Sequence, residues 1–116
     1  LPITVNAGTG TPHFTFTATP SQVTSAAYQI SAPVTYTLTS VNGFSGTVVV
    51  SQQASGEVEI FPTSDDESLT VSPSGPTTLT RRFTRFIGTD DISVVFTATH
   101  QASATSRSVT TLVKNP

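Results

Sequence analysis

Residues 39–51 of this 116-residue chain read Thr39-Ser-Val-Asn-Gly-Phe-Ser-Gly-Thr-Val-Val-Val-Ser51. The dipeptide Asn42-Gly43 is a strong turn signal, because both residue types tolerate a positive φ. The run that follows, from Gly46 to Gln53, has a near-continuous apolar middle, which is typical of a strand in the interior of a sheet. The stretch therefore predicts two strands joined by a turn, with the second strand in a central position.

Alternation of apolar and polar residues dominates the sequence on both sides of this turn. The segment before it places Val34, Tyr36 and Leu38 on one face and threonines on the other. Further strands are expected at residues 13–19, 57–61, 69–71, 77–87, 92–98 and 107–113, with a looser crossing at 21–32 and a polar hairpin at 100–105. Seven to nine short strands without a helical segment predict an all-β fold. Two packed antiparallel sheets are expected, because a single open sheet would leave one apolar face in water.

The composition excludes several classes of function. Only 10% of the residues are charged and the net charge is -2, so no basic patch is available for nucleic acid. The polar surface comes instead from 23 threonines and 15 serines. No apolar run approaches the roughly 20 residues that span a membrane, and the absence of cysteine leaves stability to the core and the strand ladders.

The stretch 39–51 resembles the "NGFSGTV" segment of immunoglobulin-like β-sandwich modules of secreted bacterial and archaeal proteins. The resemblance continues at Phe14-Thr-Phe-Thr-Ala-Thr-Pro-Ser21, Phe61-Pro62, Leu69-Thr-Val-Ser-Pro73 and Val94-Val-Phe-Thr-Ala-Thr99, and so covers roughly residues 13–113. It differs at Ile92, where such modules often have an aromatic residue, and at Arg81-Arg-Phe-Thr-Arg85. The resemblance implies an immunoglobulin-like sandwich with a spacer, adhesive or structural role and no catalysis.

Three arginines interrupt the pattern of the strand at 77–87. Arg81 and Arg85 share the parity of the apolar Leu79 and Phe83, whereas Phe86 lies on the other parity. This break predicts a bulge or an exposed edge. Arg81, Arg82 and Arg85 are then expected to protect that edge from unwanted pairing, and binding of an anionic polymer is the alternative.

No residue pattern points to catalysis. The sequence has no Gly-x-Ser-x-Gly elbow, and His13 and His100 lack metal-ligand spacing and are expected at the surface. Tryptophan is absent and Tyr28 and Tyr36 are the only tyrosines, which weakens a carbohydrate-binding interpretation. We therefore expect a protein that is not an enzyme and has no cofactor and no small-molecule substrate.

Carboxylates cluster at two places in the sequence, and these are the only candidates for a calcium site. Because Ca²⁺ takes six to eight oxygen ligands and no EF-hand spacing is present, solvated loops are the expected state of both clusters. The candidates are Asp65, Asp66, Glu67, Asp90 and Asp91.

Residues 1–12 precede the module at 13–116 and contain one more alternating segment. Leu1, Ile3 and Val5 are apolar, and a hinge of Gly and Thr follows them. The segment is an interdomain linker, an extra strand folded on its own sheet, or a donor strand that completes a sheet of the next subunit. In the last case Leu1, Ile3 and Val5 form the subunit interface.

The chain begins at Leu1 and contains no methionine, so we expect either a removed signal peptide or a piece of a longer protein. The favoured expectation is an extracellular, cell-surface structural subunit. It would self-assemble head to tail into a pilus-like filament, since such contacts do not close on themselves. The alternative is a spacer or adhesion module of a larger secreted or surface protein.

Overall fold

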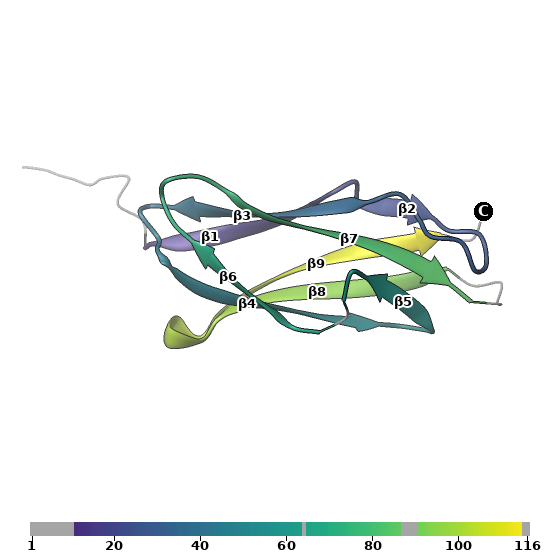
Figure 1. The fold of residues 1–116 in the computed structure, drawn as a ribbon. Helices are drawn as coiled ribbons and strands as arrows, with labels where there is room; N and C mark the ends of the chain where they lie inside the picture. Colours follow the sequence, from purple (N-terminus) through teal and green to yellow (C-terminus); the bar gives the residue numbers. More distant parts are fainter. Residues whose placement is uncertain (1–10, 64, 87–90, 115–116) are drawn as a thin grey trace, which may run out of the picture.

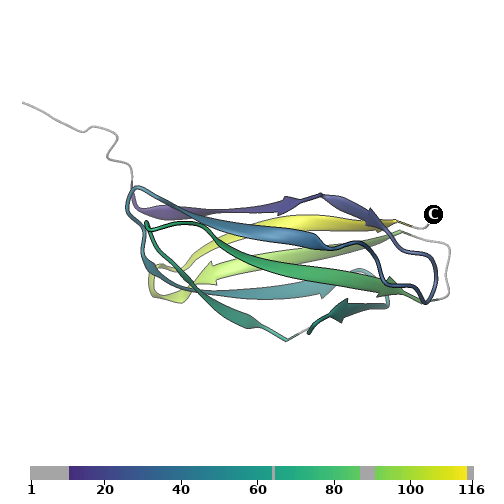
Figure 2. The same cartoon turned by 45° about the horizontal axis from the view of Figure 1, so that its top comes forward.

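The computed structural model describes residues 11–63, 65–86 and 91–114. In these ranges the chain forms two packed sheets, as Figures 1 and 2 show from two directions. The strands are β1 (His13–Thr19), β2 (Gln22–Thr24), β3 (Val34–Val41), β4 (Gly46–Ala54), β5 (Val58–Phe61), β6 (Glu67–Val71), β7 (Thr77–Arg85), β8 (Ile92–His100) and β9 (Thr105–Lys114). The predicted all-β sandwich is confirmed. A single 3-10 turn, η1 (Gln101–Ser103), lies within the expected hairpin at 100–105.

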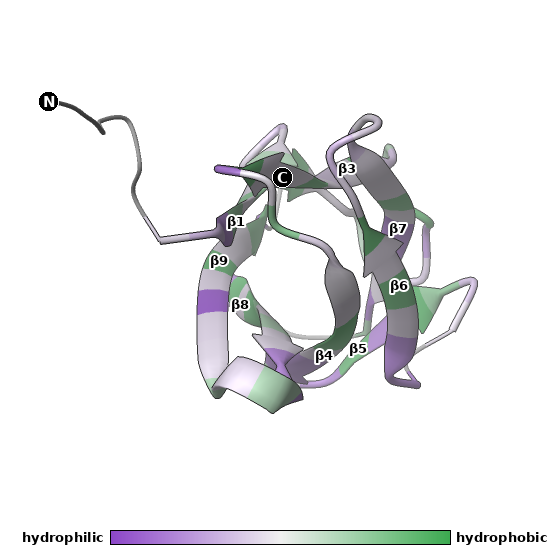
Figure 3. Cartoon of the chain, turned by 90° about the vertical axis from the view of Figure 1, so that its left-hand side faces the viewer, coloured by the Kyte–Doolittle hydropathy of each residue, from purple (hydrophilic) through white to green (hydrophobic). Residues whose placement is uncertain are grey.

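One sheet has the order β1-β3-β7-β5 and the other has the order β2-β9-β8-β4-β6. Neighbouring strands are antiparallel except β2 and β9, which run parallel with Val23 opposite Val113. The chain changes sheets between β1 and β2, so β1 and β2 border different sheets on the same side of the sandwich. The view along the strands in Figure 3 shows β1 beside β9.

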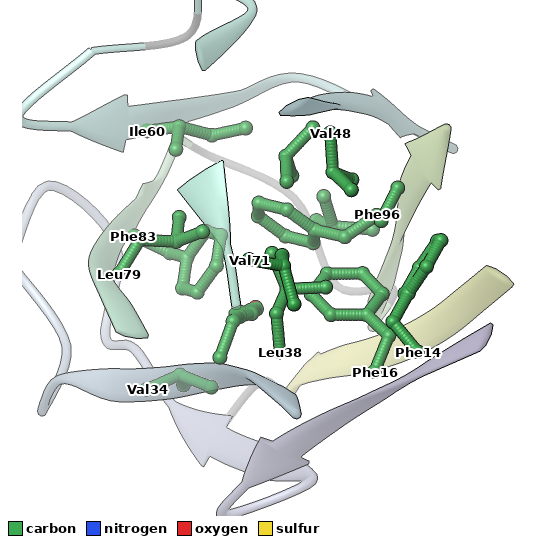
Figure 4. Close-up of a cluster of buried hydrophobic side chains, with 14 of the residues drawn as sticks. Phe14, Phe16, Val34, Leu38, Val48, Ile60, Val71, Leu79, Phe83 and Phe96 are labelled. Atoms are coloured by element: carbon green, nitrogen blue, oxygen red, sulfur yellow. The ribbon is translucent and has the colours of Figure 1, made fainter. Parts of the chain in front are cut away.

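The core lies between the sheets and consists of the inward row of each strand (Figure 4). Phe14, Tyr36 and Phe96 are fully buried, as the alternation predicts. The Tyr36 ring lies 4.1 Å from the Phe96 ring between centroids and 6.1 Å from the Phe16 ring. Each buried aromatic side chain of this kind contributes about 1.5–3 kcal/mol through burial.

The turn predicted at residues 42–43 is present. Asn42 has φ 57° and Gly43 has φ 79°, and the amide of Phe44 donates to the carbonyl of Val41. The strand that follows, β4, lies between β8 and β6, so the prediction of a central strand is confirmed.

The prediction of a bulge or an exposed edge at residues 77–87 is wrong for residues 82–85, which pair with β5. Residues 77–81 pair with β3 and with no other described strand. β7 lies between β3 and β5 and keeps its inward alternation through Leu79, Arg81, Phe83 and Arg85. Arg81 is 3% exposed and Arg85 is 1% exposed, so neither can protect an edge. Only the exposed Arg82 lies on the outer face. Arginine is usually a surface residue, whereas here two arginines occupy inward positions.

Candidate functional site

The carboxylates proposed for calcium do not form a cluster in the part of the chain that the structure describes. Asp65, Asp66 and Asp91 are exposed, and Glu67 is paired with Arg81. Within residues 11–63, 65–86 and 91–114, no three His, Asp or Glu side chains come close enough to hold a metal ion. Asp90 lies outside the described residues.

Arg81 connects the two sheets at the side where β6 and β7 approach each other. Its Nη2 donates to Glu67 Oε1 on β6, and its Nη1 donates to the carbonyl of Thr80. The Glu67 side chain is 40% exposed while that of Arg81 is 4% exposed. The pair therefore neutralises a charge that burial would otherwise make costly.

Arg85 and two buried serines hold residues 25–31 against β7. The Nη1 of Arg85 donates to the carbonyl of Ser25 at 3.1 Å. The hydroxyl of Ser25 accepts from the amide of Arg85, and that of Ser31 accepts from the amide of Phe83. The buried arginines are thus structural groups of the sandwich and do not form an anion-binding surface.

The segment held in this way presents an aromatic pair to solvent. Tyr28 is 62% exposed and Ile30 is 53% exposed, and the Tyr28 ring lies edge-on to Phe86 at 6.0 Å between centroids. Tyr28 also has φ 64°, an uncommon value for a residue with a side chain. A separate surface hollow of about 320 Å³ is lined by Phe61, Pro62, Thr80 and Arg82.

The opposite end of the sandwich is closed by the motif residues of the 42–46 turn. The Phe44 ring lies 5.3 Å from the Phe14 ring and 4.9 Å from the His100 ring, between centroids. His100 Nδ1 lies 2.6 Å from Ser103 Oγ, but the Ser103 hydroxyl donates to Thr105 Oγ1. This histidine is thus packed against an aromatic ring, and its serine neighbour is not oriented as a nucleophile.

Another feature with the capacity to bind a further strand is an unpaired edge of β9. The short β2 pairs with Leu112, Val113 and Lys114 only. Residues 105–110 of β9 pair with β8 on one side and with no other described strand. Sequence reasoning missed this edge, because the alternating Ser106, Ser108 and Thr110 resemble an ordinary polar face. Leu1, Ile3 and Val5, the predicted interface residues, lie outside the described residues.

The topology and the core define an immunoglobulin-like β-sandwich. No protein-family model matches the chain, and no curated protein sequence matches it either. Among solved structures, a chain from the complex of zinc 2-glycoprotein and prolactin inducible protein from human seminal plasma is similar in fold. It superposes with a TM-score of 0.67 at 7% identity, over 89% of this chain and 93% of that chain. This similarity supports the fold and carries no information about function. No helix long and apolar enough to cross a membrane occurs among the described residues.

Proposed function

We propose that this protein is a non-catalytic structural subunit of an extracellular filament on a cell surface, joined head to tail by its N-terminal segment. Leu1, Ile3 and Val5 of one copy would enter a sheet of the next copy as a donor strand. The proposal needs no cofactor, nucleic acid or small-molecule substrate. It agrees with the resemblance to surface modules of secreted bacterial and archaeal proteins.

The observation that carries the proposal is the position of the alternating segment ahead of a sandwich whose core is already formed. Phe14, Val48 and Phe96 are fully buried and belong to a core cluster drawn from the described strands. In the proposal, the apolar residues at positions 1, 3 and 5 serve a second molecule. In addition, β1 begins and β9 ends at opposite ends of the sandwich (Figure 1), a geometry that suits a linear array of subunits.

A deletion of residues 1–10 tests the proposal, because it leaves β1 intact. Full-length protein should sediment as long particles and show filaments by negative-stain electron microscopy, whereas the deletion variant should sediment as a monomer. Ile3→Asp should also abolish filaments by placing a charge at an inward position, while the matched control Thr4→Asp should keep them. Full-length protein that stays monomeric at its highest soluble concentration would overturn the proposal.

The second candidate is a spacer or adhesion module within a larger secreted or surface protein. The placement of the start of β1 and the end of β9 at opposite ends favours it equally, since the chain of a tandem module also enters at one end and leaves at the other. It predicts a monomer at every concentration and no change in particle size on deletion of residues 1–10.

A further inference from the structure

We propose that the acceptor for the N-terminal strand is the free edge of β9 at residues 105–110, and that the strand docks there parallel to β9. This inference rests on the proposed function, and it specifies where and in which direction the donor strand of another copy binds. Among the described strands this edge has no partner, because β2 covers only Leu112, Val113 and Lys114. The proposal follows from three features: the backbone groups that face this edge, the position of Pro2 and the length of the edge.

The backbone groups of the even-numbered residues of β9 point away from β8. The amide of Leu112 donates to Ser21, and the carbonyl of Lys114 accepts from Ser25. Because successive residues of a strand present their backbone groups to opposite sides, Ser106, Ser108 and Thr110 must present theirs to the free edge. Their side chains lie on the outer face of the sheet, where Thr97 and Thr99 bond to Ser108 and Ser106.

In a strand that pairs parallel to β9, the residues whose backbone groups bond to β9 are the residues whose side chains point inward. β2 demonstrates the rule: Ser21 and Ser25 bond to β9, and Val23, of the same parity, is the strand residue whose side chain is buried. A parallel donor strand would thus use the backbone of its inward residues, Leu1, Ile3 and Val5. Pro2 would face away from β9, so its missing amide proton would cost no hydrogen bond.

Antiparallel pairing on the same edge would reverse this relationship. Directly opposed residues of an antiparallel pair share both their face and their bonding role. Pro2 would then stand at a bonding position whenever Leu1, Ile3 and Val5 point inward. Pro2 therefore selects the parallel direction on β9.

The direction of β9 fits a neighbouring copy in a head-to-tail array. β1 and β9 start at the same end of the sandwich, because the guanidinium of Arg107 lies over the Phe14 ring at 5.9 Å from its centroid. A copy stacked in the same orientation sends its N-terminal segment along its neighbour in the direction of β1 and β9. A segment folded back on its own β9 would run antiparallel, the direction that Pro2 disfavours.

The other free edges fit a strand of this direction less well. On β6, the carbonyl of Thr70 points away from β4 and accepts a hydrogen bond from the Thr77 hydroxyl. The Thr70 side chain is exposed on the outer face. An antiparallel partner there would again require bonding by Pro2. On β1 the inward residues face the free edge, so a parallel partner has the same defect. Two further edges are compatible with Pro2 but are shorter than the six residues of β9. They are β5, with the four residues Val58–Phe61, and the stretch of β7 that β5 leaves uncovered, with the five residues 77–81.

The lengths of donor and edge agree. Residues 1–6 match residues 105–110 one to one, with Ile3 opposite Arg107 and Val5 opposite the half-buried Val109. The five residues 7–11 can span about 17 Å when extended, whereas residues 111–114 of the acceptor cover about 13 Å. The tether is thus long enough to pass the part of β9 that β2 occupies.

Disulfide trapping between separate single-cysteine chains tests this arrangement, since the natural chain has no cysteine. Val5→Cys and Val109→Cys chains, co-assembled from dissociated subunits, should give a disulfide-linked dimer on a non-reducing gel. Directly paired strands lie about 4.8 Å apart, within the range that a disulfide bridges. The pair of Thr4→Cys and Val109→Cys chains should give little disulfide-linked dimer, because the side chain at position 4 would point outward. A disulfide-linked dimer from Leu1→Cys and Val109→Cys chains would instead indicate antiparallel docking and contradict the proposal.

Proline substitution at the edge of β9 provides a second test, with filament assembly as the measurement. Ser108→Pro removes an amide proton that faces the free edge, so the fold should persist while assembly falls at least tenfold. Ser68→Pro is the matched control on the opposite edge of the same sheet, and Ser108→Ala controls for the lost side-chain contact to Thr97; both should assemble normally. Thermal unfolding of the monomeric variants confirms that they are folded.

The outcomes separate this inference from the function on which it rests. Filaments that form with a crosslink from Val5→Cys to Val58→Cys on β5, or that tolerate Ser108→Pro, would overturn the β9 acceptor and leave donor-strand assembly standing. Absence of filaments in the full-length protein would overturn both.

Discussion

The hydroxyl of Tyr36 on β3 is hydrogen-bonded to Thr111 Oγ1 on β9, and both side chains are completely buried. This bond joins the two sheets through the centre of the sandwich. Burial raises the pKa of the Tyr36 hydroxyl well above its ordinary value, while the hydrogen bond to Thr111 and the charge of Arg81 oppose the shift. The phenol is therefore neutral at neutral pH, and it acts as a structural link.

Removal of both partners of this bond should destabilise the fold by less than the sum of the two single removals. Tyr36→Phe leaves the Thr111 hydroxyl buried without its partner, at a cost of about 1–3 kcal/mol. Thr111→Val should cost a similar amount, and the double variant should cost less than the sum of the two. A double-mutant cycle from urea unfolding measures this coupling, and strict additivity would contradict the inter-sheet role.

Loss of the carboxylate of Glu67 should expose the cost of burying Arg81. Glu67→Gln leaves a nearly buried guanidinium without its ion partner, and we expect a loss of about 1–3 kcal/mol. This lies between the values for exposed and buried pairs, because solvent screens the half-exposed Glu67. Arg82→Met, at the exposed neighbouring position, should change stability by less than about 0.5 kcal/mol. Equal effects of the two variants in chemical unfolding would refute the structural role of Arg81.

A methyl group at Gly46 should clash with His100. A Cβ at this position would lie 2.7 Å from His100 Nε2, so Gly46→Ala should destabilise the protein by about 1–3 kcal/mol. In a His100→Ala background, Gly46→Ala should cost much less stability than it does in the natural protein, because the clashing side chain is absent. Gly43→Ala, where no atom lies within 4 Å but φ is +79°, should cost about 1 kcal/mol through backbone strain alone. Thermal unfolding of the four variants separates contact from strain.

Calcium should leave the melting temperature unchanged. Asp65, Asp66 and Asp91 are exposed and Glu67 is occupied by Arg81. A site with a dissociation constant of about 1 mM would stabilise the fold by about 1.4 kcal/mol at roughly 10 mM Ca²⁺, enough to raise the melting temperature by several degrees. Melting curves in calcium and in chelator decide between these outcomes, and such a rise would identify a site that includes the candidate carboxylates.

Local sequence patterns were sufficient to predict most of the fold. The alternation at His13–Thr19 and Ile92–Ala98 identifies strands and their buried faces, because a half-buried strand requires side chains of opposite character at successive positions. Asn42-Gly43 identifies its turn, since its two residues adopt positive φ. The apolar middle of β4 predicts its interior position. These properties are written within a few consecutive residues.

The arginines show where local patterns fail. Arg81 occupies an inward position because Glu67, on a strand of the other sheet, neutralises it, and Arg85 is held by the carbonyl of Ser25, 60 residues away. No local pattern contains these partners, so the sequence does not show that both arginines point inward.

The sequence by itself determined that this protein is an all-β sandwich with an additional alternating segment, Leu1 to Val5, ahead of its core. Only the tertiary structure decided that Arg81 and Arg85 of β7 point inward and that residues 105–110 of β9 have no partner on one side among the described strands. The reason is physical: strand character depends on neighbours in sequence, whereas edge or centre depends on which distant strand occupies each row of backbone groups. That same long-range pairing leaves the backbone groups of Ser106, Ser108 and Thr110 without a described strand partner, next to the start of β2.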